Sequence, residues 1–199
     1  MSRSVTVRRM KTRVLGPWEV SAIGFGAMQL SSSHKPLPDE AQAIRTVHAA
    51  LDAGVTLIDT ADIYAPSWDQ MGHNERIVAK ALKSWSGDRD SIVVATKAGI
   101  TRAEGEKWGR DGSPEYLRAA VDKALTNLEV DVIDLLQWHR PDRWKVYGEV
   151  VATFGELQQE GKVRTVGISN ANVEEIDIAA EVLGDGNLVS VQNEFSPKF

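Results

Sequence analysis

The stretch Ile92-Val93-Val94-Ala95-Thr96-Lys97 is a near-continuous apolar run that ends in a charged residue. Such a run is typical of a strand buried on both faces of a parallel sheet. Two similar runs end in Asp59 and His139, and Tyr64 follows Asp59 by five positions. Ligands bind beyond the carboxyl ends of the strands in parallel α/β sheets, so we expect these four polar side chains at one edge. An acid, a phenol, an amine and an imidazole at one edge predict a proton-transfer site.

Strand-like and helix-like segments alternate on both sides of this stretch. Near-continuous apolar strands separated by amphipathic helices indicate a parallel sheet covered by helices. A hairpin with a Gly16-Pro17 turn is expected over residues 14–23. The expected strands are residues 23–28, 56–59, 92–96, 132–138, 165–168 and 188–191, and the expected helices are residues 39–53, 75–85, 114–128, 146–159 and 173–183.

Two missing phosphate-binding motifs distinguish between the parallel folds. No Gly-x-Gly-x-x-Gly follows the first strand, and no Gly-x-x-x-x-Gly-Lys loop occurs. We therefore predict the α/β class and an incomplete TIM-type (β/α)8 barrel, with about six of its eight strands, after the N-terminal hairpin. Residues 1–11 are expected to form a tail, and residues 12–199 a single partial barrel domain.

Composition narrows the function classes. The 199 residues are 42% hydrophobic and 26% charged, which is typical of a globular domain. The net charge of −5 argues against a nucleic-acid partner, and no apolar run reaches the roughly 18 residues of a membrane span. The absence of cysteine excludes thiolate metal sites and fits the cytoplasm. No apolar segment typical of a secretory signal follows the basic N-terminus, and the sequence indicates no oligomeric state.

Five short motifs lie at the ends of the expected strands. They are Leu57-Ile58-Asp59-Thr60-Ala61-Asp62-Ile63-Tyr64, Val94-Ala95-Thr96-Lys97, Asp134-Leu135-Leu136-Gln137-Trp138-His139-Arg140-Pro141, Val166-Gly167-Ile168-Ser169-Asn170 and Val191-Gln192-Asn193-Glu194-Phe195-Ser196-Pro197. In this order, and over nearly all of residues 12–199, the chain resembles the aldo-keto reductase family. One such motif is weak evidence, whereas five in order are specific.

The resemblance implies an NADPH-dependent oxidoreductase, with NADH possible, that reduces a small-molecule aldehyde or ketone to an alcohol. It implies that Tyr64 is the general acid, that Lys97 and Asp59 tune the phenol, and that His139 orients the carbonyl. It implies no metal. The residues that the resemblance assigns to cofactor binding are Gly26, Ala27, Met28, Asp59, Ser169, Asn170 and Gln192.

The physical chemistry of these residue types agrees with the implied roles. A free phenol titrates near pH 10, and a cation within roughly 4–6 Å favours the phenolate. We therefore expect Lys97 to lower the pKa of Tyr64. An isolated buried lysine is costly, so a carboxylate partner is expected, and Asp59 fits that place.

Each of these residues also has an alternative interpretation. Alone, Asp59 is a strand-end cap, Tyr64 a packing residue and His139 a satisfied polar side chain. Lys97 could instead form a Schiff base in an unrelated barrel lyase or isomerase. A protein that keeps the fold without catalysis is another alternative. Four acidic or imidazole side chains in one loop have no recognised metal-ligand spacing, and a solvated loop is favoured for Asp62, Asp69, His73 and Glu75.

Several further residues are candidates for shaping the substrate site. Arg140 directly follows His139, and either an anionic substrate or an ion pair with Asp142 would account for it. Three large apolar side chains in loops after strands are candidates for a substrate wall or for packing, namely Trp68, Met71 and Trp108.

The resemblance places two further barrel strands after the last residue of this sequence. Those strands usually supply the aromatic residue that stacks on the nicotinamide and the basic residues for the 2′-phosphate. We therefore expect a truncated or partial chain, which binds NADPH poorly and tends to aggregate because its apolar sheet edges are unpaired.

Overall fold

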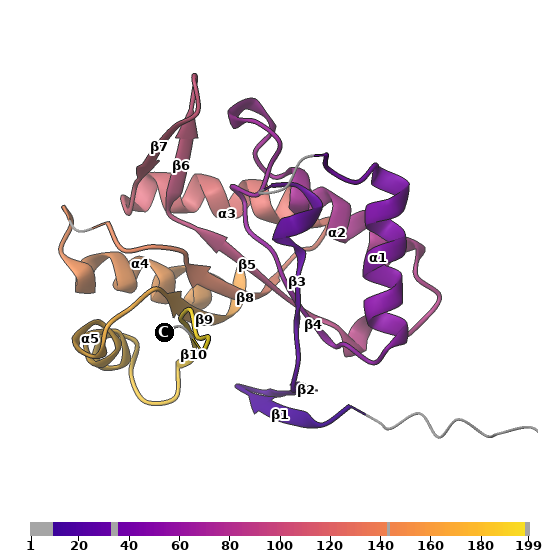
Figure 1. Cartoon of the computed structure of the whole chain (residues 1–199). Coiled ribbons are helices and arrows are strands. Elements are labelled where there is room, and N and C mark those ends of the chain that lie inside the picture. The colour runs from indigo at the N-terminus through magenta and orange to yellow at the C-terminus, as the bar shows by residue number, and fades with distance from the viewer. Residues whose placement is uncertain (1–9, 33–35, 143, 198–199) are drawn as a thin grey trace, which may run out of the picture.

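A computed structural model describes residues 10–32, 36–142 and 144–197, so most of the expected tail lies outside the described residues. Its centre is a six-stranded parallel sheet in the order β10-β9-β8-β5-β4-β3 (Figure 1). Strand β5 lies inside this sheet and is buried at all six positions. The strands are β3 (Phe25–Gly26), β4 (Leu57–Asp59), β5 (Val93–Ala98), β8 (Ile133–Trp138), β9 (Val163–Ser169) and β10 (Leu188–Gln192).

Five α-helices connect the strands and cover the outer face of the sheet (Figure 1). Their starts follow from side-chain caps: Asp39 accepts from the Gln42 amide, and Asn172 forms a capping box with Glu175. Ser113 caps the helix whose first residue is Pro114. The helices are α1 (Glu40–Asp52), α2 (His73–Ser84), α3 (Pro114–Leu128), α4 (Tyr147–Gln159) and α5 (Val173–Leu183).

Side chains alternate along β8 between the helix side and the opposite side of the sheet. Trp138 is buried on the helix side, where its ring lies 4.8 Å from that of Tyr147 and 6.3 Å from that of Phe154. Both partners belong to α4, so the prediction that Trp138 points toward the helix layer is confirmed. The neighbouring His139 then emerges at the end of the strand, on the other side.

An antiparallel hairpin of β1 (Thr12–Leu15) and β2 (Trp18–Ser21) precedes the sheet, as predicted. Gly16 begins its turn with a φ of 54°, a left-handed conformation that favours glycine. The hairpin is attached to the strand region by reciprocal bonds: the Ser21 amide donates to Thr56 Oγ1 at 2.7 Å, and the Thr56 amide to Ser21 Oγ at 2.9 Å.

Contacts between distant strands show that the sheet curls. Three strands separate β10 from β4 in the sheet order, yet Gln192 Nε2 donates to Asp59 Oδ1 at 3.2 Å. At the other end of the strands, a Cβ added to Gly16 would lie 2.7 Å from Val189 Cγ1, so the hairpin turn touches β10. The fold is therefore an incomplete (β/α)8 barrel, which confirms the predicted class.

Three local features differ from the sequence-based expectation. The first sheet strand is only β3, because the 3₁₀ helix η1 (Ala27–Leu30) follows it at once. Helix α2 begins two residues early, after Gly72, whose φ of 81° redirects the chain. A second hairpin, β6 (Ile100–Ala103) and β7 (Lys107–Arg110), was not predicted and projects from the end of β5 (Figure 1).

None of the described helices has both the length and the apolar character needed to cross a bilayer.

A buried carboxylate attaches helix α2 to strand β5. Glu75 is fully buried, and its Oε1 accepts from Thr96 Oγ1 at 2.6 Å while its Oε2 accepts from Asn127 Nδ2 at 2.9 Å. Burial raises the pKa of Glu75, and the two hydrogen bonds oppose that shift. Because side chains alternate along a strand, Thr96 faces the helix and Lys97 the opposite side. Glu75 therefore fixes the strand that carries Lys97.

Replacing Glu75 tests this attachment. Alanine leaves the Thr96 hydroxyl and the Asn127 amide without an acceptor, so we expect E75A to lower the free energy of unfolding by about 2–3 kcal/mol. E75Q keeps one acceptor oxygen and should cost about 1 kcal/mol. Urea unfolding followed by circular dichroism measures both. Glu181→Ala, on the exposed side of α5, is the matched control, and an E75A value no larger than this control's would contradict the attachment.

Candidate active site

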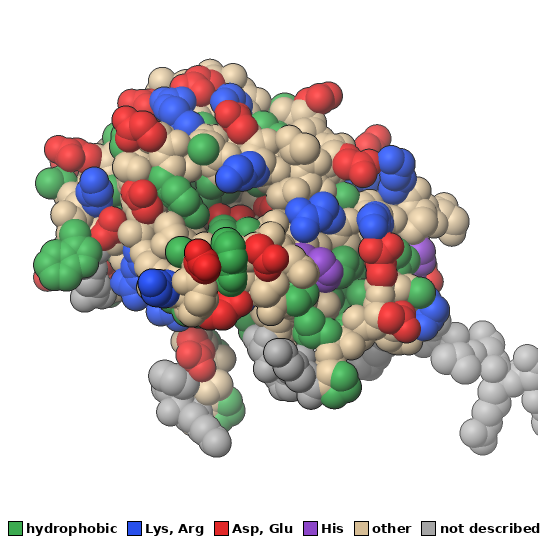
Figure 2. Space-filling view, turned by 90° about the horizontal axis from the view of Figure 1, so that it is seen from above, with side chains coloured by type: hydrophobic (Ala, Val, Ile, Leu, Met, Phe, Trp, Pro, Cys, Tyr) green, Lys and Arg blue, Asp and Glu red, His purple; other side chains and the backbone are tan. Residues whose placement is uncertain are grey.

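The four polar residues singled out in the sequence meet at the carboxyl ends of the strands. Asp59 ends β4, Lys97 lies near the end of β5, His139 follows β8, and Tyr64 lies in the loop after β4. The Tyr64 and His139 rings are edge-on, with centroids 5.6 Å apart at 87°, and Lys97 Nζ lies 5.4 Å from the phenol centroid. Figure 2 views the molecule from this end and shows acidic and basic side chains interspersed over it.

Lys97 is held at the base of this group by two oxygen atoms. Its Nζ lies 2.5 Å from Asp59 Oδ1 and donates to the backbone oxygen of Thr60 at 3.0 Å. Only 1% of its side chain is exposed, against 21% for Asp59. Burial lowers the pKa of Lys97, and the Asp59 carboxylate opposes this by favouring the charged amine. The predicted Lys97–Asp59 pair is present.

The pKa of Tyr64 departs from its ordinary value in the direction opposite to the one expected. Burial raises it, and the nearby carboxylates of Asp59 and Asp62 raise it further, while Arg140 lowers it. The expectation of a lowered pKa for Tyr64 is therefore wrong. Burial of the phenol and the two carboxylates outweigh the effect of the Lys97 cation, whose Nζ lies 5.4 Å from the ring centroid. Tyr64 is therefore protonated at neutral pH.

The imidazole of His139 is neutral. Burial lowers its pKa to about 3, and the charges of Lys97 and Arg140 act in the same direction. Its Nδ1 is buried and has no hydrogen-bond partner within the described part of the chain. A neutral imidazole has one N–H donor and one acceptor nitrogen, so His139 can form a hydrogen bond with a polar group that enters from the cavity.

The residues at the ends of β9 and β10 form a polar cluster. Ser169 Oγ donates to the Gln192 backbone oxygen at 2.9 Å, and Asn170 Nδ2 lies 3.0 Å from both Ser169 Oγ and the His139 backbone oxygen. Asn170 adopts a left-handed φ of 58°, which turns the chain back toward the site. The side-chain carbonyls of Asn170 and Gln192 accept no hydrogen bond from the described residues, so both can accept one from a ligand amide.

Gly26, Ala27 and Met28, which were expected near the cofactor, have three different environments. Met28 lines the cavity described below. Ala27 is fully buried in the core, and its backbone oxygen accepts from Asn74 Nδ2 at 2.8 Å. Gly26 is exposed, and a Cβ added there would meet no atom within 4 Å, so the space beside its backbone is open.

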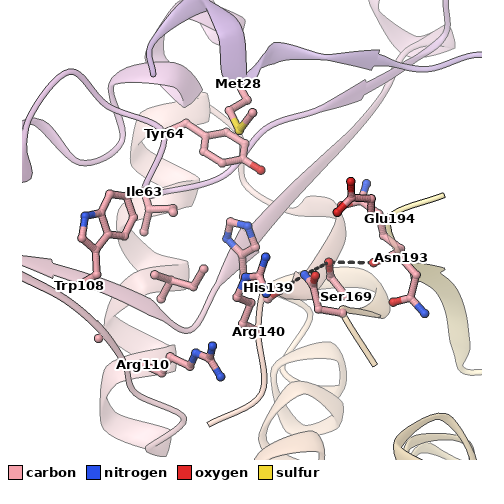
Figure 3. Close-up of a pocket in the computed structure, with 14 residues that line it drawn as sticks. Met28, Ile63, Tyr64, Trp108, Arg110, His139, Arg140, Ser169, Asn193 and Glu194 are labelled. Atoms are coloured by element: carbon pink, nitrogen blue, oxygen red, sulfur yellow. Dashed lines mark hydrogen bonds between the residues drawn. The ribbon is translucent and has the colours of Figure 1, made fainter. Parts of the chain in front are cut away.

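A cavity of about 660 Å³ joins the phenol, the imidazole and the polar cluster (Figure 3). Trp108, one of the three candidates for a substrate wall, lines it from hairpin β6–β7. The other two do not: Trp68 lies in a 3₁₀ helix, η2 (Trp68–Gln70), and Met71 packs against Ile63 and Ile100. The cavity is lined by Met28, Ile63, Tyr64, Ile100, Trp108, Gly109, Arg110, His139, Arg140, Ser169, Asn170, Gln192, Asn193 and Glu194.

Sequence reasoning missed the residues that the unpredicted hairpin brings to this cavity, Arg110 above all. Gly105 is the available signal, because a glycine between two short polar and aromatic stretches is typical of a hairpin turn. The turn also includes Glu106, whose φ of 59° is uncommon for a residue other than glycine. Because glutamate rarely adopts this conformation, its position in the sequence did not indicate a turn.

Three of the four residues considered as metal ligands have separate partners, and the expectation of a solvated loop is wrong for Asp62 and Glu75, which are buried. His73 Nδ1 lies 2.9 Å from Ser31 Oγ, and Asp69 accepts from Ser67 at 2.6 Å, while Glu75 is bound as described above. Asp62 is buried, and neither of its carboxylate oxygens has a partner among the described residues. Within residues 10–32, 36–142 and 144–197, no group of three such side chains could hold a metal ion.

Comparison with known proteins identifies the family. The model of the aldo/keto reductase family matches residues 22–198. A protein of Novosphingobium aromaticivorans named 6-dehydroglucose reductase is 37% identical over 179 residues, which are 89% of this chain and 56% of that protein. Aldo-keto reductase YhdN of Bacillus subtilis is 36% identical over 159 residues, which are 80% of this chain and 46% of that protein.

Solved structures agree with the sequence relatives. The holo form of the aldo-keto reductase AKR11C1 of Bacillus halodurans superimposes with a TM-score of 0.79 at 37% identity, over 94% of this chain and 58% of that one. The chain spans about half the length of the curated relatives it matches. Because the family match extends over most of the sequence and includes all five strand-end motifs, the chain belongs to the aldo/keto reductase family.

Proposed function

We propose that this site reduces an aldehyde or ketone to an alcohol with a reduced nicotinamide cofactor, NADPH or alternatively NADH, and that Tyr64 is the general acid. One observation carries the proposal: the phenol of Tyr64 and the imidazole of His139 lie edge-on, with ring centroids 5.6 Å apart, on the wall of one cavity. The reductase names of relatives at 36–37% identity support the same reaction class.

The cofactor would supply a hydride to the carbonyl carbon. Its nicotinamide carboxamide needs hydrogen-bond acceptors for its NH₂ group, and the side-chain oxygens of Asn170 and Gln192 fit that need. Ser169 would fix the backbone around them through its bond to Gln192. Met28 would provide an apolar contact on the other side of the cavity. We keep Gly26, Ala27 and Asp59 as proposed neighbours of the cofactor.

The protonation state of Tyr64 suits a proton donor. With a raised pKa the phenol keeps its proton until charge develops on a carbonyl oxygen next to it. Transfer of that proton leaves a phenolate. Lys97 Nζ lies 5.4 Å from the centroid of the Tyr64 ring, and its positive charge stabilises the new negative charge. Lys97 therefore offsets part of the cost of ionising the buried phenol, and Asp59 holds it in place.

His139 would orient the carbonyl by a hydrogen bond. Its neutral imidazole lies beside the phenol, so one carbonyl oxygen can receive a hydrogen bond from each ring. The small-molecule carbonyl substrate and a cytoplasmic location, which suits a chain without cysteine, complete the proposal.

The Schiff-base alternative has weaker support. A lysine nucleophile must reach the substrate with a free amine, whereas Lys97 is 1% exposed, is paired with Asp59 and does not line the cavity. Retention of the whole Asp59, Tyr64, Lys97 and His139 set also favours catalysis over a purely structural role for the fold.

Tyr64→Phe tests the assigned acid. Removing the transferable proton should lower the rate of carbonyl-dependent NADPH oxidation by about 10²–10⁴-fold, measured by the loss of reduced-nicotinamide absorbance with an aromatic aldehyde. Tyr147→Phe is the matched control, because the buried Tyr147 hydroxyl has no partner in the described residues and its ring packs on Trp138. A Y64F rate within threefold of the Y147F rate would refute the role of Tyr64.

The neutral state of His139 predicts a specific pH dependence of stability. Its pKa of about 3 in the folded chain lies below the ordinary value of 6.5, so as the pH falls below 6.5 only the unfolded chain takes up a proton there. Stability must therefore fall, by about 2 kcal/mol from pH 7 to pH 5 for this residue.

Urea unfolding of the wild type and of His139→Asn at both pH values isolates this contribution. The variant should lose about 2 kcal/mol less than the wild type between pH 7 and pH 5. Equal losses in the two proteins would show that His139 titrates normally, and the orienting role based on its neutral ring would then be abandoned.

A further inference from the structure

Two arginine side chains lie on one wall of the cavity beside the proposed acid. Arg110 ends strand β7 and Arg140 directly follows His139, and both line the cavity (Figure 3). Arg110 Nη1 donates to the Pro141 backbone oxygen at 2.8 Å. That bond places the Arg110 guanidinium beside the segment that carries Arg140, so the hairpin and the loop after β8 contribute to one basic wall.

The nearby carboxylates do not neutralise this wall. Asp142, the alternative partner of Arg140, accepts instead from the backbone amides of Gly112 at 3.4 Å and Trp144 at 3.2 Å. Asp111 accepts from the Ser113 amide at 2.8 Å. Within the described residues Arg140 forms no hydrogen bond or ion pair, and Arg110 binds a carbonyl rather than a carboxylate. Both guanidiniums therefore keep donors for an anion.

The charges that line the cavity leave an excess of one positive charge. Glu194 is the single carboxylate among the described lining residues, against Arg110 and Arg140, and His139 is neutral. The deeper Lys97–Asp59 pair cancels internally. A ligand with one negative charge balances this set, whereas a phosphate, which carries about −1.5 to −2 at neutral pH, exceeds it.

An apolar surface adjoins the two arginines. Trp108 lies two residues before Arg110 on β7, so both side chains are on the same face of the strand. The indole is 58% exposed and is supported from behind by the Arg102 guanidinium at 4.6 Å. Arg102 is itself held by the backbone oxygens of Ile63 and Ala65. Trp108 can therefore pack against the carbon skeleton of a ligand whose charge reaches Arg110.

We propose that the carbonyl substrate carries a carboxylate, which Arg110 and Arg140 bind while Trp108 packs on the carbon skeleton between carboxylate and carbonyl. The inference rests on the proposed function, because it places the reacting carbonyl at Tyr64 and His139. It names two specificity-determining residues that contact the substrate at a distance from the reacting atoms.

A pair of isosteric aldehydes tests the proposal by binding alone. 4-Carboxybenzaldehyde carries a carboxylate where 4-nitrobenzaldehyde carries a neutral nitro group of the same shape. Dissociation constants from ligand-observed NMR should favour the carboxylate by about tenfold in the wild type, and raising the salt from about 50 mM to 500 mM should reduce the preference. R110Q/R140Q should abolish the preference without changing the affinity for the nitro compound, and R110K/R140K should restore part of it.

Arg45→Gln, on the exposed side of α1, is the matched control and should keep the full preference. Equal wild-type affinities for the two aldehydes would overturn the proposal. A parallel loss of affinity for both in R110Q/R140Q would also overturn it, as would a loss of NADPH affinity with the carboxylate preference intact. Tyr64→Phe should keep the preference, so a failure of the proposed catalysis and a failure of the carboxylate site are seen separately.

Discussion

The ion pair between Lys97 and Asp59 is the constraint on which the arrangement of the site depends. An ammonium with 1% exposure is tolerated only with a carboxylate and a further acceptor in contact, which Asp59 and the Thr60 carbonyl supply. These partners come from β4 and its end, so the pair fixes how β4 and β5 lie relative to each other. Tyr64 follows Asp59 by five residues, and its ring lies above the Lys97 ammonium, 5.4 Å from Nζ to the ring centroid.

The same strands secure the site from their other face. Thr96, next to Lys97, bonds to Glu75 of α2, and Trp138, next to His139, packs on α4. In both strands the residue on the helix side is immobilised by packing or hydrogen bonding, and its neighbour faces the site: His139 lines the cavity, and Lys97 lies beneath it, paired with Asp59. Alternation along a strand thus lets the core hold the functional side chains without occupying their positions.

Much of this arrangement could be predicted from the sequence, because periodic segments with caps and strand-end polar residues carry strong local signals. Helix α3 was predicted to the residue from Ser113 and Pro114. The family resemblance implied Asp59 as the partner of Lys97, and the cost of a buried amine agreed with it. The direction of the Tyr64 pKa shift could not be predicted, since it is set mainly by burial of the phenol, which depends on how the loop after β4 packs in the fold. Hairpin β6–β7, and Arg110 with it, was missed because its turn uses a left-handed Glu106.

The hydrogen bond from Gln192 to Asp59 joins residues 133 positions apart in the chain. Contacts of such long sequence separation form late, after loop closure has been compensated by nearer pairings. Chain synthesis reaches β4 long before β10, so Asp59 can bond to Gln192 only after β10 has been synthesised. The segment from β4 to β5 contains both Lys97 and Asp59, whereas the far wall of the cavity requires residues from β10 and from the segment after it.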